Sequence, residues 1–88
     1  MNPIAKVTEL FKSLDEIQGV EIISITTHDY SIQELYSIAG HYSVDVDEAT
    51  GHNDLVMWSL IERKNKHGVL IELSIYSKSK TATTKVAA

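Results

Sequence analysis

The stretch LVMWSLIERKNKHGVLIELSIYS, residues 55–77, decides the fold. It contains two apolar runs, residues 55–63 and 69–77, separated by the polar loop KNKHG that ends on Gly68. Short runs rich in Val, Ile and aromatic residues, joined by a loop that contains Gly, are typical of a β-hairpin. The sequence therefore predicts two adjacent antiparallel strands near the end of the chain.

The two runs differ in the spacing of their apolar residues. In the second run one face is expected to carry Val69, Ile71, Leu73 and Ile75. Its other face would present Glu72, Ser74 and Tyr76 to solvent, so Tyr76 is a candidate exposed contact. The first run has Val56, Trp58 and Leu60 on one face and Leu55, Met57 and Ile61 on the other. Two apolar faces indicate a central strand covered on both sides, and the large area of Trp58 favours a place in the core.

Upstream of the hairpin, the chain begins with the pattern of an amphipathic helix. Asn2 can cap the helix, Pro3 suits its first position, and Gly19 suits a left-handed C-cap. Between them the apolar residues recur every three or four positions, at Ile4, Val7, Leu10, Phe11, Leu14 and Ile17. The β-branched residues 20–27 that follow predict a strand.

The middle of the chain allows two interpretations. Apolar residues alternate along much of residues 30–46, which is typical of extended chain. However, Ser31 and Glu34 have the spacing of a capping box, and Gly40 can end a two-turn helix. We therefore predict a helix over residues 32–39, followed by a strand at residues 41–47.

These elements define an α+β domain. The expected order is an N-terminal amphipathic helix, a strand, a short helix and a three-stranded antiparallel meander, with about four strands in one sheet and the helices packed on it. The last residues, KSKTATTKVAA, contain almost no large apolar side chain. We predict a single globular domain over residues 1–77 and a flexible basic tail over residues 78–88.

Composition narrows the setting and the partners. The chain has no cysteine, which favours a reducing compartment, and no apolar run near the roughly 18 residues of a membrane span. We therefore expect a cytoplasmic protein with no membrane partner. Residues 1–62 carry eleven acidic residues and two lysines, whereas residues 63–88 carry six basic residues and one acidic residue. An acidic body argues against a nucleic-acid partner.

One segment, residues 41–54, contains side chains that could bind a metal. They are His41, Asp45, Asp47, Glu48, His52 and Asp54. Their spacing matches neither an EF-hand loop nor an HExxH motif. A solvated acidic connection is therefore the favoured interpretation, with no cofactor and no catalytic residue, and a metal-dependent enzyme is the further alternative.

An apparent excess of apolar surface suggests the function. If the long helix covers one face of the sheet, only the short helix remains to cover the other. Uncovered apolar surface of a few hundred Å² usually marks an interface. We therefore expect a non-catalytic protein-interaction module that binds itself or another protein, with Leu55, Met57, Ile61 and Tyr76 as the interface, or with an exposed sheet edge in that role. The alternative is an acidic inhibitor or nucleic-acid mimic that presents Asp45, Asp47, Glu48 and Asp54 to a basic partner.

Overall fold

A computed structural model describes residues 2–51 and 54–79 of the chain. Its elements are α1 (Pro3–Ser13), β1 (Ile22–Thr27), α2 (Ile32–Tyr42), β2 (Asp47–Gly51), β3 (Asp54–Lys64) and β4 (Leu70–Ser79). Two helices and one four-stranded sheet confirm the predicted α+β class. The strand β4 ends at Ser79, two residues beyond the predicted end of this strand at Ser77. Residues 80–88 lie outside the described part of the chain.

The first helix begins where the sequence predicts and ends earlier. The Asn2 side chain accepts a hydrogen bond from the Ile4 N–H at 2.8 Å, and Pro3 occupies the first turn. The helix ends at Ser13 with Leu14 as its C-cap, so the prediction that Gly19 ends it is wrong. Gly19 has a φ of 89° and lies in the connection to β1, where the left-handed conformation favours glycine.

The second helix confirms the predicted start and corrects the predicted end. Ser31 and Glu34 form a reciprocal capping box. The helix continues through Gly40 to Tyr42, and Ser43 takes the left-handed C-cap position with a φ of 57°. The predicted strand over residues 41–47 is therefore wrong, because residues 41 and 42 belong to the helix. Gly40 does not end the helix, since a glycine within a helix costs only about 1 kcal/mol and tertiary packing can compensate for this cost. The strand begins at Asp47.

The sheet has the strand order β1-β4-β3-β2 and is mixed. The strands β2, β3 and β4 form the predicted antiparallel meander, in which Trp58 lies opposite Tyr76. The strand β1 adds to its far side in parallel with β4, with Ile25 beside Leu73. Consequently β1 and β2 are the two edges, and β4 and β3 are the central strands.

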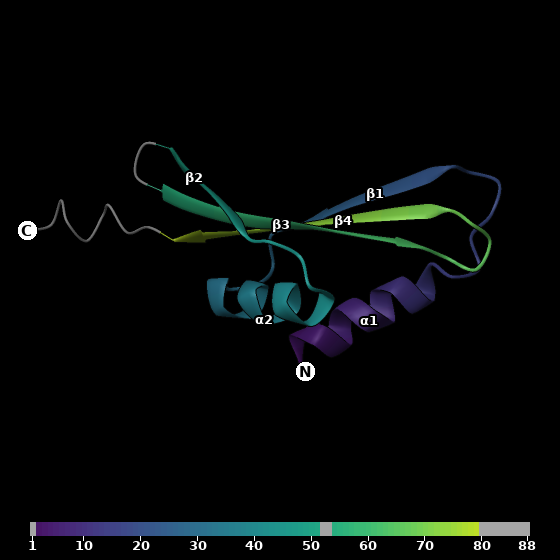
Figure 1. The fold of residues 1–88 in the computed structure, drawn as a ribbon, viewed down its shortest axis with the longest axis horizontal. Helices are drawn as coiled ribbons and strands as arrows, with labels where there is room; N and C mark the ends of the chain where they lie inside the picture. Colours follow the sequence, from purple (N-terminus) through teal and green to yellow (C-terminus); the bar gives the residue numbers. More distant parts are fainter. Residues whose placement is uncertain (1, 52–53, 80–88) are drawn as a thin grey trace, which may run out of the picture.

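Both helices lie on the same face of the sheet, below it in the view of Figure 1. The core forms between this helix layer and the sheet, and its buried apolar residues are Val7, Leu35, Ile38, Met57, Ile61, Leu73 and Ile75. The expectation that two faces of the sheet are covered is therefore wrong. We call the side without helices the open face.

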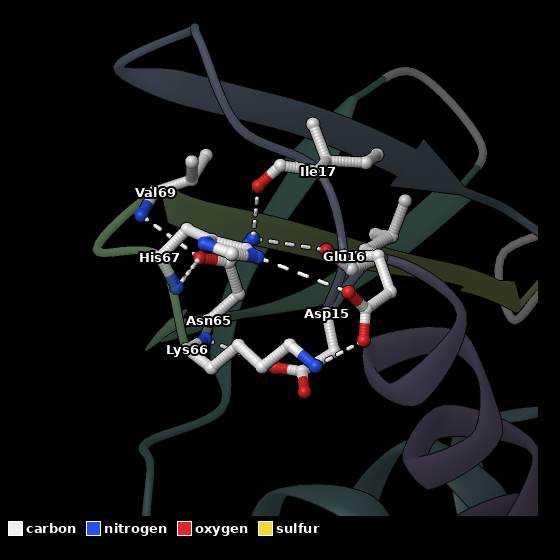
Figure 2. A network of polar contacts seen from close by, with 8 residues as sticks. Asp15, Glu16, Ile17, Asn65, Lys66, His67 and Val69 are labelled. Atoms are coloured by element: carbon white, nitrogen blue, oxygen red, sulfur yellow. Dashed lines mark hydrogen bonds and ion pairs between the residues drawn. The ribbon is translucent and has the colours of Figure 1, made fainter.

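The loop between β3 and β4 is tied to the connection between α1 and β1 (Figure 2). The buried Asn65 side chain donates hydrogen bonds to the Leu14 and Ile17 carbonyls at 3.0 and 2.8 Å. Its Oδ1 atom accepts bonds from the backbone N–H groups of His67 and Val69 at 2.8 and 3.0 Å. One amide thus satisfies backbone groups of two segments that are far apart in the sequence.

Candidate interaction surfaces

Most of the interface predicted from the sequence lies in the core. Met57 and Ile61 are 5% and 1% exposed, and Leu55 packs against the same cluster. The prediction that these residues form an uncovered face is therefore wrong. In the register of the hairpin, Ile61 lies beside Leu73 on the apolar face of β4, and both helices lie on this side of the sheet (Figure 1).

The register also shows which signal could have identified the covered face. Directly opposed residues in an antiparallel pair share one face of the sheet. The face of β4 that carries Leu73 is apolar, whereas the face that carries Glu72 is polar. Placing β3 beside β4 through the short loop would therefore have assigned Ile61, and not Trp58, to the core.

The open face carries a row of aromatic rings. The Tyr76 ring stacks on His28 with a centroid separation of 5.4 Å and on Trp58 with a separation of 6.1 Å. Trp58 is therefore half-buried among its neighbours and lies outside the core, contrary to the prediction. Leu60 lies on the same face and is 37% exposed. Tyr76 lies on this open face, as its place in the alternation of β4 predicts.

A hollow of about 470 Å³ opens beside Tyr76 and is lined in part by Tyr30 and Ser31. Tyr30 has the Lys6 Nζ atom 5.4 Å from its ring centroid. Burial, together with the nearby carboxylates of Asp29 and Glu34, raises the pKa of the Tyr30 hydroxyl above its usual value. Tyr30 therefore stays protonated at neutral pH, as an unperturbed tyrosine would.

The predicted acidic surface is divided between the two faces of β2. Asp45, Asp47 and Glu48 are all exposed. Asp47 lies opposite Trp58 and so belongs to the open face, whereas Glu48 lies opposite Met57 on the helix side. Asp54 begins β3, and its side chain lies outside the described part of the structure. Among the described residues, Asp47 and Glu48 thus lie on opposite faces of this edge strand and form no continuous patch on one face.

The possible metal ligands that the structure describes are not brought together. His41 lies in α2, where its ring contacts Tyr42 at 4.8 Å. Among residues 2–51 and 54–79, no three His, Asp or Glu side chains are grouped in a way that could hold a metal ion. His52 lies outside these residues.

An exposed sheet edge was the alternative interface expected from the sequence, and β1 is one of the two edges. Its six residues, IISITT, carry no charge. Its first residue, Ile22, is 53% exposed, and Val20, two residues before the strand, is 51% exposed. An uncharged edge strand without proline is a template for pairing with another chain.

Comparisons with protein-family models, with curated proteins and with solved structures gave no match. Among the described residues, no helix is long and apolar enough to cross a membrane. The function must therefore be inferred from the surfaces of this chain itself.

Proposed function

We propose that this protein is a self-associating interaction module in which β1 pairs with β1 of a second copy. The unprotected edge of β1 is the observation that carries this proposal. Antiparallel pairing of the two β1 strands would join two four-stranded sheets about a two-fold axis, which is the commonest symmetry of homo-oligomers. We infer a cytoplasmic setting from the lack of cysteine.

The hydrogen bonds of β1 identify the groups that would pair. The Leu70 N–H donates to the Glu21 carbonyl at 3.0 Å, so the backbone polar groups of Glu21 point toward β4. Backbone groups alternate in direction along a strand. The N–H and C=O groups of Ile22, Ser24 and Thr26 therefore point toward the free edge of the sheet, where they can bond to a second chain.

The side chains of β1 suit a two-fold pairing centred on Ser24. Ser24 would lie opposite Ser24 of the partner subunit, and Ile22 opposite Thr26 of the partner subunit. On the helix side, Ile23 would lie opposite Ile25 of the partner subunit, which pairs two β-branched residues across the strands. This register places no two like charges opposite one another, because residues 22–27 are all neutral.

The packing of β1 leaves apolar area for a partner to cover. Helix α2 packs against β3 and β4, whereas neither helix packs closely on β1. Ile23 and Ile25 on the helix side are consequently only half-buried, and Ile22 on the open face is exposed. Pairing would cover part of this area while it satisfies the edge N–H and C=O groups.

Light scattering and sedimentation of the purified chain test the proposal. We expect a dimer at tens of micromolar protein and a monomer for Thr26→Pro, because proline removes an edge N–H that makes no bond to β4. Thr26→Val is the matched control and should remain dimeric. A monomeric mass for the unmodified chain at about 100 µM, a concentration at which micromolar complexes form, would refute the proposal.

A second variant guards against a folding defect in Thr26→Pro. Ile22→Lys adds a charge to the edge strand at an exposed position, so this variant should be monomeric. Circular dichroism should show that its fold is unchanged. If both folded variants remain dimeric, the two copies do not meet at β1.

A further inference from the structure

A groove of about 380 Å³ lies where α1, the end of α2 and the start of the β3–β4 loop meet. Its walls combine aromatic rings with basic side chains. Its lining residues that matter here are Thr8, Phe11, Lys12, Asp15, Tyr42 and Arg63. This volume lies within the range of about 300–1,000 Å³ that is usual for small-molecule sites.

The charge of the groove is opposite to that of the whole chain. The protein has a net charge of −4, yet the groove is lined by Lys12, Arg63 and Lys64. Asp15 is an acidic lining residue, and its Oδ1 atom accepts a hydrogen bond from the Lys66 backbone N–H at 3.0 Å. The three cations thus give this part of the surface a local preference for anions.

The Arg63 guanidinium lies near two aromatic rings and forms no ion pair with a described carboxylate. Its guanidinium carbon lies 5.5 Å from the Tyr42 ring centroid and 6.0 Å from the Phe11 ring centroid. Throughout the described residues, no carboxylate forms an ion pair with Arg63. Its N–H donors can therefore bind a planar carboxylate or a phosphate in the two-bond geometry that arginine favours.

The two rings are themselves fixed. Phe11 and Tyr42 meet edge to face, with centroids 6.0 Å apart and planes at 63°. The Tyr42 hydroxyl lies 3.3 Å from Thr8 Oγ1, within hydrogen-bonding distance. A half-buried aromatic wall beside a positioned guanidinium suits a ligand that joins a flat apolar body to an oxyanion.

We propose that this groove binds a small organic anion. Its phosphate or carboxylate group would bind Arg63, with Lys12 nearby, and its ring would lie against Phe11 and Tyr42. This site goes beyond the proposed self-association, because it lies on the helix side of β3 and uses no residue of the β1 edge.

NMR titration with four small molecules tests the contribution of the ligand's ring and of its oxyanion separately. Phenyl phosphate and benzoate present the same ring with different oxyanions, phenol presents the ring alone, and inorganic phosphate presents the anion alone. We expect at least one of the two ring-bearing anions to bind with a dissociation constant below about 1 mM, and about tenfold more tightly than phenol or inorganic phosphate. The tighter of the two identifies the class as phosphate esters or carboxylates.

Variants of the full chain assign the binding to Arg63. Arg63→Gln should weaken the binding by about tenfold or more, whereas Lys66→Gln should leave it unchanged, because Lys66 pairs with Glu16 outside the groove. Arg63→Lys keeps the charge and should recover only part of the affinity. The amide spectrum of each variant reports whether its fold is intact.

Three results would overturn the proposal. They are the lack of saturable shifts with both ring-bearing anions, equal binding of inorganic phosphate and phenyl phosphate, and an Arg63→Gln variant that is folded and binds normally.

Discussion

The two edges of the sheet differ in how they are protected. Strand β2 (Asp47–Gly51) has five residues, two of them acidic, whereas β1 (Ile22–Thr27) has six residues, all of them neutral. Charged residues are a common device that prevents edge-to-edge pairing. One edge thus carries such charges and the other does not, which is the asymmetry expected when a single edge is kept for a partner.

The connections that precede the two edge strands also differ in the side-chain hydrogen bonds that they receive. The connection before β1 is held by the buried Asn65, which bonds to the Leu14 and Ile17 carbonyls. The connection before β2 is held by the buried Ser59, whose hydroxyl donates to the Asp45 carbonyl at 2.7 Å. The connection before the uncharged edge strand β1 thus receives two side-chain hydrogen bonds, and the connection before β2 receives one.

The largest effect should come from Asn65→Ala. This change removes four hydrogen bonds to backbone groups, of which the Leu14 carbonyl keeps a second bond from the Ile17 N–H, and it should lower the free energy of unfolding by about 3 kcal/mol. Urea unfolding of the two proteins measures the difference. Asn65→Asp keeps the acceptor but turns a carboxylate toward two carbonyl oxygens, so it should be at least as destabilising. A loss below about 0.5 kcal/mol would place Asn65 among ordinary surface residues.

A smaller loss is expected at the other edge. Ser59→Ala removes one hydrogen bond to the chain before β2 and should cost about 1.5 kcal/mol by the same measurement. Ser74 is a suitable control, because it is half-buried on the open face of the neighbouring strand. Equal losses for Ser59→Ala and Asn65→Ala would remove the difference in anchoring between the edges.

The protection of β2 can be removed directly. Replacing Asp47 and Glu48 together with threonine gives this edge the neutral, β-branched character of β1. We expect association to strengthen by about fivefold and to extend beyond a dimer, because each copy then offers two unprotected edges. Sedimentation velocity measures the change. An unaltered dimer would mean that the charges of Asp47 and Glu48 are not what keeps β2 from pairing.

The smallest effect concerns the exposed ion pair between Lys66 and Glu16, which joins the β3–β4 loop to the connection before β1. The hydrogen bond from Lys66 lowers the pKa of the Glu16 carboxyl below its ordinary value of 4.5. A lowered folded-state pKa means that the stabilisation is complete above 4.5 and is lost as the pH falls through the folded-state value. Glu16→Gln should therefore melt slightly lower than the unmodified protein near neutral pH. The gap between the two melting temperatures should close in acid, and a gap that is the same at both pH values would exclude this origin.

The same pair has a limit on the alkaline side. The bond to Glu16 raises the pKa of the Lys66 ammonium above 10.5, so its contribution is complete below that value and is lost as the pH rises through the folded-state pKa. Both side chains are exposed, which keeps the contribution small in salt.

Local signals in the sequence predicted the elements more reliably than their ends. Ser31 and Glu34 predict the start of α2 correctly, because a capping box is made within four residues. The end of α2 was mispredicted, because glycine suggests a C-cap, yet the left-handed position is taken by Ser43. Packing of Tyr42 against the core cluster, which no local pattern reveals, favours the longer helix.

The candidate surfaces were harder to predict, since they depend on contacts distant in the sequence. The neutral β-branched run of β1 resembles an internal strand, and only its parallel pairing with β4 places it at the edge. Asn65 looks like an ordinary polar residue of an exposed loop, because its partners Leu14 and Ile17 lie about fifty residues away. Arg63 likewise resembles a solvated end of the hairpin until α1 supplies Phe11.

The parallel pairing of β1 with β4 also sets an order for folding. The bond from Ser24 to Glu72 joins residues 48 positions apart, whereas the β3–β4 hairpin closes through a short loop. Closing the longer loop costs more chain entropy, so the hairpin is expected to form first and β1 to dock late. During synthesis, β1 leaves the ribosome well before its neighbour in the sheet exists. For that interval both edges of the strand are unpaired. The longer the interval lasts, the more time another chain has to pair with the strand.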